Sequence, residues 1–236
     1  MQNLRLLHVA RSGVSANPEA ATRAVYERWA PLYPPVAHNP LMRAEQAAML
    51  RHWPDVTGRL ALDLACGSGR YSRILEQKGA AEVIALDFCT PMLAQVTSAK
   101  RVCASMMQLP FAADAFDVVI SGLALGHAAS VAAWMLEVAR VLRPGGTLLY
   151  SDYHPQAARA GLPRSFKDRD ARTWTVPHQS FDLDSQRDAA RAANLTVEVI
   201  QDIHVGVELN EAFPKSDAFY RQWQGLPIAL IVRARK

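Results

Sequence analysis

The segment from Leu60 to Phe88 constrains the fold of this chain more than any other part of it. Its pattern predicts a buried strand, a glycine turn, a helix and a second buried strand, with Asp63 and Asp87 near the ends of the two strands. Gly67 and Gly69 remove side chains where the turn must pass close to a ligand. Asp87 stands 20 residues after Gly67, where a carboxylate would hold a ribose diol. The segment therefore predicts a nucleoside pocket.

Length and composition predict a single domain. The chain has 236 residues, of which 50% are hydrophobic, and this is enough for one sizeable core. We expect a helical lid at 1–58, a cofactor-binding core at 59–152, and a substrate-side segment with the terminal strands at 153–236. Residues 1–18 show no clear period and are expected to form a loose arm or a short lid piece.

Cysteine usage and charge restrict the location and the partners. Cys66, Cys89 and Cys103 show no paired spacing and no metal-ligand cluster is present, so we expect reduced cysteines, no metal and a cytoplasmic location. No stretch approaches the length that a bilayer requires, so no membrane span is expected. The net charge is +4, but the arginines are scattered among acidic residues. This pattern favours a solvated, mildly basic surface over a nucleic-acid interface.

Strands alternate with helices along most of the chain. Helices are expected over 19–29, 40–53, 70–78, 91–100, 131–142 and 183–193, and strands over 60–64, 83–86, 116–121, 147–152, 196–205 and 228–235, with a short strand ending near Ala104. A hairpin is expected over 165–176. The alternation predicts an α/β, doubly wound, Rossmann-like fold with a mainly parallel seven-stranded sheet. The last two strands lack a full crossover helix, which predicts an antiparallel C-terminal edge.

The glycine turn departs from the pattern of nicotinamide dinucleotide enzymes. Those enzymes have a third glycine three residues after the second, and Ser72 occupies that position here. Asp63, at the end of the first strand, is placed to hold a cationic amine or to brace the amides of the loop. A nicotinamide dehydrogenase remains an alternative, which tight NADH binding would favour.

Three later motifs add more information than the turn. They are Gln108-Leu-Pro-Phe, Phe116-Asp-Val-Val and Val141-Leu-Arg-Pro-Gly-Gly-Thr-Leu-Leu. With the glycine turn, their order and spacing resemble class I S-adenosylmethionine-dependent methyltransferases from about Tyr26 to Asp152. Among these, the chain is most similar to small-molecule enzymes related to the quinone-biosynthesis methyltransferases and to the methyl-esterifying enzyme of biotin synthesis.

The resemblance implies S-adenosylmethionine as cofactor. The residues that would contact it are Tyr33, Arg43, Asp63, Ala65, Gly67, Gly69, Asp87, Phe88, Ser105, Met106, Ser121 and Gly122. Asp87 would accept from both ribose hydroxyls, and Tyr33 and Arg43 would reach the methionine carboxylate. Ala65 replaces the first loop glycine of the family, and Ser105 replaces the acidic residue that receives the adenine amino group. We therefore expect weaker cofactor binding rather than none.

Two histidines are candidate general bases. His127 follows the strand 116–121 and is the first choice, and His154 follows the strand 147–152, with Asp152 available to orient it. His127 could instead cap or bridge the following helix, and His154, which precedes Pro155, could instead belong to a structural corner. A carboxylate or phenolate acceptor would need no base at all, so the role of both residues depends on the acceptor.

The residues that follow the strand 116–121 indicate the class of substrate. Enzymes that methylate exocyclic amines of nucleic-acid bases have an Asn/Asp-Pro-Pro-aromatic stretch there, whereas this chain has Ser121-Gly-Leu-Ala. Segments 155–182 and 207–225 could roof an apolar or aromatic small molecule. The resemblance thus predicts methyl transfer to oxygen, nitrogen or carbon of a small molecule. The alternative is a non-catalytic binding module with the methyltransferase fold, which Ala65 and Ser105 would permit.

Overall fold

A computed structural model describes residues 18–97, 99–206, 209 and 218–236. Within these ranges the strands are β1 (Leu60–Leu64), β2 (Glu82–Asp87), β3 (Lys100–Cys103), β4 (Phe116–Gly122), β5 (Leu142–Tyr153), β6 (Ser165–Lys167), β7 (Thr173–Thr175), β8 (Thr196–His204) and β9 (Pro227–Arg235). The helices are α1 (Pro18–Trp29), α2 (Pro40–Arg51), α3 (Arg70–Gln77), α4 (Thr90–Leu93), α5 (Val131–Val141), α6 (Pro155–Arg159), α7 (Leu183–Ala192) and α8 (Ala218–Trp223), with short 3-10 turns η1 (Ala30–Leu32) and η2 (Leu125–His127). The arm expected at the amino terminus lies outside the described residues, apart from Pro18.

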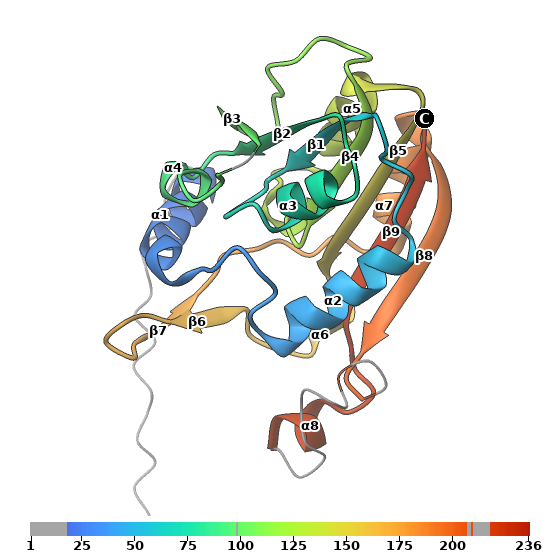
Figure 1. Ribbon diagram of the computed structural model, residues 1–236. Coiled ribbons are helices and arrows are strands. Elements are labelled where there is room, and N and C mark those ends of the chain that lie inside the picture. The colour runs from blue at the N-terminus through green and yellow to red at the C-terminus, as the bar shows by residue number, and fades with distance from the viewer. Residues whose placement is uncertain (1–17, 98, 207–208, 210–217) are drawn as a thin grey trace, which may run out of the picture.

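A seven-stranded sheet in the order β3-β2-β1-β4-β5-β9-β8 forms the centre of the molecule (Figure 1). The five strands from β3 to β5 are parallel, and β9 runs antiparallel to both of its neighbours. The last strand of the chain therefore inserts between β5 and β8, and β8 forms the edge. The predicted fold class, with its antiparallel C-terminal strands, is confirmed.

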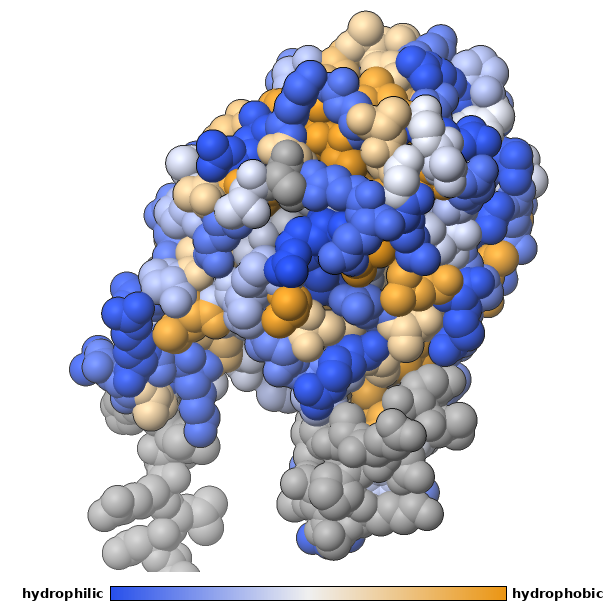
Figure 2. Space-filling model, viewed as in Figure 1, coloured by the Kyte–Doolittle hydropathy of each residue, from blue (hydrophilic) through white to orange (hydrophobic). Residues whose placement is uncertain are grey.

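Helices cover both faces of the sheet, because the strands are apolar on both sides. Trp134 of α5 packs with Tyr150 in one core cluster, to which α7 also contributes. Met49 of α2 and Tyr71 of α3 pack with Ile120 in the other. In Figure 1, α2 and α3 lie in front of the sheet, while α5 and α7 lie behind it. On the outer surface in the same view, hydrophilic residues surround small apolar areas (Figure 2).

The helix expected over 91–100 is much shorter, since α4 ends at Leu93. Beyond it, the amides of Gln95 and Val96 donate to carbonyls three residues earlier, so the chain continues in tight turns. These turns carry Val96 beneath Gly69, where a methyl group on the glycine would lie 2.9 Å from a Val96 carbon. The chain therefore leaves the helix early and packs Val96 against the glycine turn.

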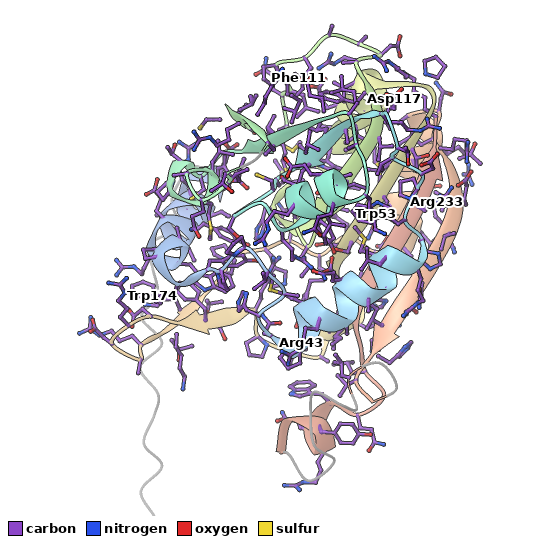
Figure 3. All side chains as sticks on the ribbon, viewed as in Figure 1. Arg43, Trp53, Phe111, Asp117, Trp174 and Arg233 are labelled. Carbon is purple, nitrogen blue, oxygen red and sulfur yellow. The ribbon has the colours of Figure 1, made fainter. Side chains whose placement is uncertain are left out.

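The predicted hairpin over 165–176 is confirmed as β6 and β7, and it lies against α1 (Figure 1). Phe166 stacks on Trp29 with ring centres 4.5 Å apart and planes 5° from parallel. The guanidinium of Arg28 lies 4.2 Å from the centre of the Trp174 ring at the end of the hairpin (Figure 3). These aromatic contacts fix α1 and the hairpin together on one side of the sheet's carboxyl ends.

Candidate functional site

A cavity of about 930 Å³, its mouth included, lies at the carboxyl ends of β1, β2 and β4. This is where parallel α/β sheets bind ligands. Its wall includes ten of the residues that the sequence predicted: Tyr33, Asp63, Ala65, Gly67, Asp87, Phe88, Ser105, Met106, Gly122 and His127. Four other predicted residues, Arg43, Gly69, Ser121 and His154, do not line it.

The turn after β1 takes its shape from three left-handed residues. Ala65, Gly67 and Gly69 have φ values of +56°, +55° and +85°. This region costs a residue with a side chain about 1 kcal/mol, so alanine at position 65 adds strain that glycine would avoid. Nothing lies within 4 Å of a methyl group added to Gly67, whereas at Gly69 Val96 fills that space. Gly67 is thus open to a ligand, and Gly69 serves the packing of the turn.

Asp87 is fixed at the floor of the cavity by two backbone amides. The amide of Gly67 donates to its Oδ2 and the amide of Cys89 donates to its Oδ1, both at 2.8 Å. The side chain is therefore rigid, yet each oxygen keeps a lone pair for a ligand. Burial raises the pKa of Asp87 to about 6, although the amides of Cys89 and Gly67 act in the opposite direction.

Asp63 is the second buried carboxyl group of the cavity. Only 1% of the residue is exposed, and its Oδ2 accepts a hydrogen bond from the Ser72 hydroxyl at 2.6 Å. Burial raises its pKa to about 6, while the hydrogen bonds from Ser72 lower it. Two carboxyl groups with raised pKa values thus stand at the ends of neighbouring strands, and such shifts are common at functional sites.

Arg70 lines the cavity in place of the predicted Arg43. Arg43 is exposed on α2 (Figure 3), because the buried side of that helix carries Met42 and Glu45. Arg70 begins α3 directly after the glycine turn, and its Nη1 donates to Glu45 Oε2 at 2.7 Å. The sequence contains a signal for this residue, since it immediately follows Gly69 at the start of a helix.

Glu45 is fully buried, and it holds two residues of the cavity wall. It also accepts a hydrogen bond from the Tyr71 hydroxyl at 2.7 Å, and the Arg70 guanidinium lies 4.2 Å from the centre of the Tyr71 ring. A methyl group on Gly122 would lie 2.3 Å from that ring. Position 122 therefore needs glycine because Tyr71 packs against it. No pattern in the sequence pointed to Glu45.

Ser105 stands beside a carboxylate that comes from another part of the chain. Its hydroxyl donates to Oε2 of Glu19 at 3.1 Å and accepts from the amide of Met107 at 3.2 Å. Glu19 belongs to the first turn of α1, and both residues line the cavity. A carboxylate therefore lies beside position 105, where the resembled family has an acidic residue, but it is supplied by α1.

A hydrogen-bonded chain of Arg164, Tyr26 and His127 forms the other end of the cavity. Arg164 Nη2 lies 3.3 Å from the Tyr26 hydroxyl, which in turn lies 2.9 Å from His127 Nε2. His127 Nδ1 lies 3.0 Å from the Pro177 carbonyl oxygen. Burial and the charge of Arg164 hold the pKa of His127 well below its usual value. His127 is therefore neutral, and Arg164 and Tyr26 are site residues that sequence analysis missed.

His154 and Ser121 lie apart from this chemistry. His154 is buried at the start of α6, where its Nδ1 accepts from the amide of Gln156 at 3.1 Å and its Nε2 lies 3.4 Å from Asp202. His154 thus caps α6 at a corner of the chain, and it does not line the cavity. Ser121 is 1% exposed and sits within β4.

The described residues contain no group of three or more histidine, cysteine, aspartate or glutamate side chains that could hold a metal ion. In those same ranges, no helix has both the length and the apolar character needed to cross a bilayer.

Comparison with known proteins identifies the domain. Residues 62–150 match the family described as "Methyltransferase domain". The chain is 35% identical over 135 residues to malonyl-[acyl-carrier protein] O-methyltransferase of Enterobacter lignolyticus, covering 56% of this chain and 53% of that one. It is 38% identical over 98 residues to demethylmenaquinone methyltransferase of Mycobacterium tuberculosis, covering 41% and 42%. The chain thus spans about half the length, or less, of these curated relatives.

Solved structures with the same fold cover more of the chain. An S-adenosylmethionine-dependent methyltransferase from Mesorhizobium loti superposes with a TM-score of 0.67 at 25% identity, covering 82% of this chain and 98% of that one. The [4+2]-cyclase SpnF superposes with a TM-score of 0.70 over 95% of this chain and 99% of that one, at 16% identity, and shows the fold alone. Together with the cavity at the strand ends, these matches show that residues 62–150 are a methyltransferase domain, in a fold that the chain shares with the S-adenosylmethionine-dependent enzyme of Mesorhizobium loti.

Proposed function

We propose that this protein transfers a methyl group from S-adenosylmethionine to a small-molecule acceptor. The observation that carries the proposal is the Asp87 carboxylate, which two amides hold in the cavity with lone pairs left for a ribose diol. When bound, the cofactor supplies an electrophilic methyl group on a positively charged sulfur. The protein's task is then to orient an acceptor and to exclude water.

The cavity residues fit the other parts of the cofactor. Phe88 follows Asp87 and offers a ring face to the adenine. Asp63 would accept from the ammonium group of the methionine end, and Arg70 would bind its carboxylate, since both side chains line the cavity. Tyr33 covers the same end, with its ring 4.7 Å from that of Trp29. Arg43, Gly69 and Ser121 do not line the cavity, so they would make no contact with the cofactor there.

Glu19 is proposed to accept the adenine amino group in place of the missing acid at position 105. We expect Glu19→Gln to weaken binding of S-adenosylhomocysteine by about fivefold, since a charge-assisted hydrogen bond becomes a neutral one. Calorimetry with S-adenosylhomocysteine and with its deaminated analogue, S-inosylhomocysteine, measures the effect. Wild type should bind S-adenosylhomocysteine more tightly than S-inosylhomocysteine. This difference in affinity should shrink in Glu19→Gln and return when Ser105→Asp is added. Glu27→Gln, exposed on the same helix, is the control. An unchanged preference in Glu19→Gln would rule out the contact.

Cofactor affinity should rise with pH through about 6, where the pKa values of Asp63 and Asp87 lie. Below that pH both carboxyl groups are protonated and lose the charge that attracts hydroxyl and ammonium donors. Protonation of each group therefore lowers cofactor affinity by up to about tenfold per pH unit. Stability of the ligand-free protein has the opposite sign, because a raised carboxyl pKa favours the folded state as pH falls from about 6 toward 4. Calorimetric titration with S-adenosylhomocysteine between about pH 5 and 7, with chemical denaturation alongside, measures both slopes. A flat affinity profile would contradict the assignment of both carboxylates.

The acceptor is proposed to be a small molecule, in line with the name of the demethylmenaquinone methyltransferase, whereas the name of the other relative gives a malonyl group on a carrier protein. Helix α1 lines the cavity at the Tyr26 end and hairpin β6–β7 packs on α1, so both are candidates for a roof over such an acceptor. Segment 207–225 lies partly outside the described residues. The three free cysteines support a cytoplasmic location. The decisive test is methyl transfer from labelled S-adenosylmethionine to a metabolite panel containing carboxylates, hydroxyarenes and amines.

A role without methyl transfer is the second candidate. SpnF shares the fold over nearly the whole chain, and its name describes a cyclisation. Ala65, with its left-handed backbone, and Ser105 are departures from the family pattern in the cofactor site, and such departures are compatible with a loss of methyl transfer. Tight binding of S-adenosylhomocysteine with no methylated product across the panel would favour this candidate.

A further inference from the structure

Arg164 contributes a cation to the cavity wall that the proposed cofactor contacts leave unused. Its Nη2 donates to the Leu123 carbonyl oxygen at 2.6 Å and to the Tyr26 hydroxyl at 3.3 Å. Its Nη1 is buried and has no hydrogen-bond partner. Arg164 is also absent from the ion pairs formed within the described ranges. A buried guanidinium nitrogen without an acceptor is costly, so a ligand that supplies one is expected.

His127, which Arg164 reaches through Tyr26, is neither a free acceptor for the guanidinium nor a strong base. The Pro177 carbonyl can only accept, so His127 Nδ1 carries the ring hydrogen and Nε2 accepts from the Tyr26 hydroxyl. The only accessible lone pair of the His127 ring is therefore occupied. With its pKa held well below the usual value, His127 is a weak base for deprotonating an acceptor.

The charges in the cavity add to this argument. S-adenosylmethionine brings a positive sulfur into the same cavity, and the charge of Arg70 is already balanced by Glu45. Burial raises the pKa of the Asp152 carboxyl group to about 6 and the charge of Arg164 lowers it, so these two groups interact through space. No carboxylate pairs directly with Arg164 within the described ranges, and a negative acceptor oxygen would give its Nη1 such a partner.

We propose that Arg164 and Tyr26 form an oxyanion-binding subsite and that the acceptor enters as an anionic oxygen nucleophile, either a carboxylate or a phenolate. This inference rests on the proposed function. A lone pair of the acceptor oxygen forms the new O–C bond while the C–S bond breaks and its electron pair goes to sulfur. The anion and the sulfonium thus become a neutral ester or ether and a neutral thioether. No proton is released, so the reaction needs no base, and His127 positions Tyr26 rather than accepting a proton.

Binding of paired probes to the protein saturated with S-adenosylhomocysteine tests the proposal. The pairs are octanoate with octanamide, and 4-nitrophenolate with 4-nitroanisole, which differ mainly in charge. In wild type, at least one anion should bind about tenfold or more tightly than its neutral partner, and the pair that shows this identifies the source as carboxylate or phenolate. Arg164→Gln should abolish the preference, and Arg164→Lys should keep part of it because the charge remains.

Two controls separate this proposal from its alternatives. Arg28→Gln removes a cation from the α1–hairpin contact outside the cavity and should leave the preference unchanged. Affinity for S-adenosylhomocysteine should stay within about twofold in Arg164→Gln, which shows that the variant is folded. Equal affinity for anion and neutral partner, no binding of any probe at about 10 mM, or equal losses for both members in Arg164→Gln would overturn the subsite. Failure of S-adenosylhomocysteine itself to bind wild type would instead refute the proposed function.

Discussion

Asp87→Ala is expected to weaken S-adenosylhomocysteine binding by about a hundredfold or more, the largest loss of affinity for a single substitution in the cavity. Two hydroxyl donors of the ribose would lose a charged acceptor, and each such bond contributes about 1.5 to 3 kcal/mol. The amides of Gly67 and Cys89 would also lose the acceptor that fixes the glycine loop. Calorimetry with S-adenosylhomocysteine at about pH 7.5, where Asp87 is ionised, measures the loss.

Asp117→Ala is the matched control for this substitution. Asp117 is also a carboxylate of the sheet and also accepts from a backbone amide, that of Leu60 at 2.9 Å. It stands at the start of β4, at the opposite end of the molecule from Trp174 (Figure 3), and does not line the cavity. Asp117→Ala should therefore leave affinity unchanged while lowering stability. Equal losses of affinity in the two variants would show that Asp87 acts through folding and not through the ribose.

The parallel half of the sheet could be predicted from sequence because its signals are local. Leu60–Leu64 is apolar apart from Asp63 and is followed by a glycine turn, and both the strand and the following helix occur at the predicted positions. The place of β9 between β5 and β8 could not be predicted in the same way. That order depends on pairing between distant strands, which the periodicity within one strand does not encode.

The site residues also fall into those with local sequence signals and those brought together only by folding. Asp63, Gly67 and Asp87 are found by motif because their spacing along the chain reflects one strand–turn–helix–strand unit. Arg164 meets Tyr26 across 138 residues, and Ser105 meets Glu19 across 86, so only the folded chain brings them together. The domain match covers residues 62–150, and both of these contacts involve at least one residue outside it.

Glu45→Gln is expected to destabilise the protein by about 3 to 5 kcal/mol, because it removes one partner of a buried ion pair. Burial alone would lower the pKa of Arg70, and the charge of Glu45 more than offsets this, so Arg70 stays charged. Without Glu45, that charge would be buried and unbalanced between α2 and the cavity. At about 2 to 4 °C per kcal/mol for a chain of this size, Tm should fall by about 10 °C, measured by thermal denaturation.

Glu82→Gln is the control that isolates burial, because the two ion pairs have nearly the same length. Lys100 and Glu82 lie 2.8 Å apart on the surface, whereas Arg70 and Glu45 lie 2.7 Å apart in the interior. The exposed pair is screened by solvent, so its loss should change stability by less than about 1 kcal/mol. Replacing both buried partners, as in Glu45→Met with Arg70→Met, should recover much of the stability lost in Glu45→Gln, because no unpaired charge remains. Similar Tm values for Glu45→Gln and Glu82→Gln would show that Glu45 does not hold the cavity wall through its charge.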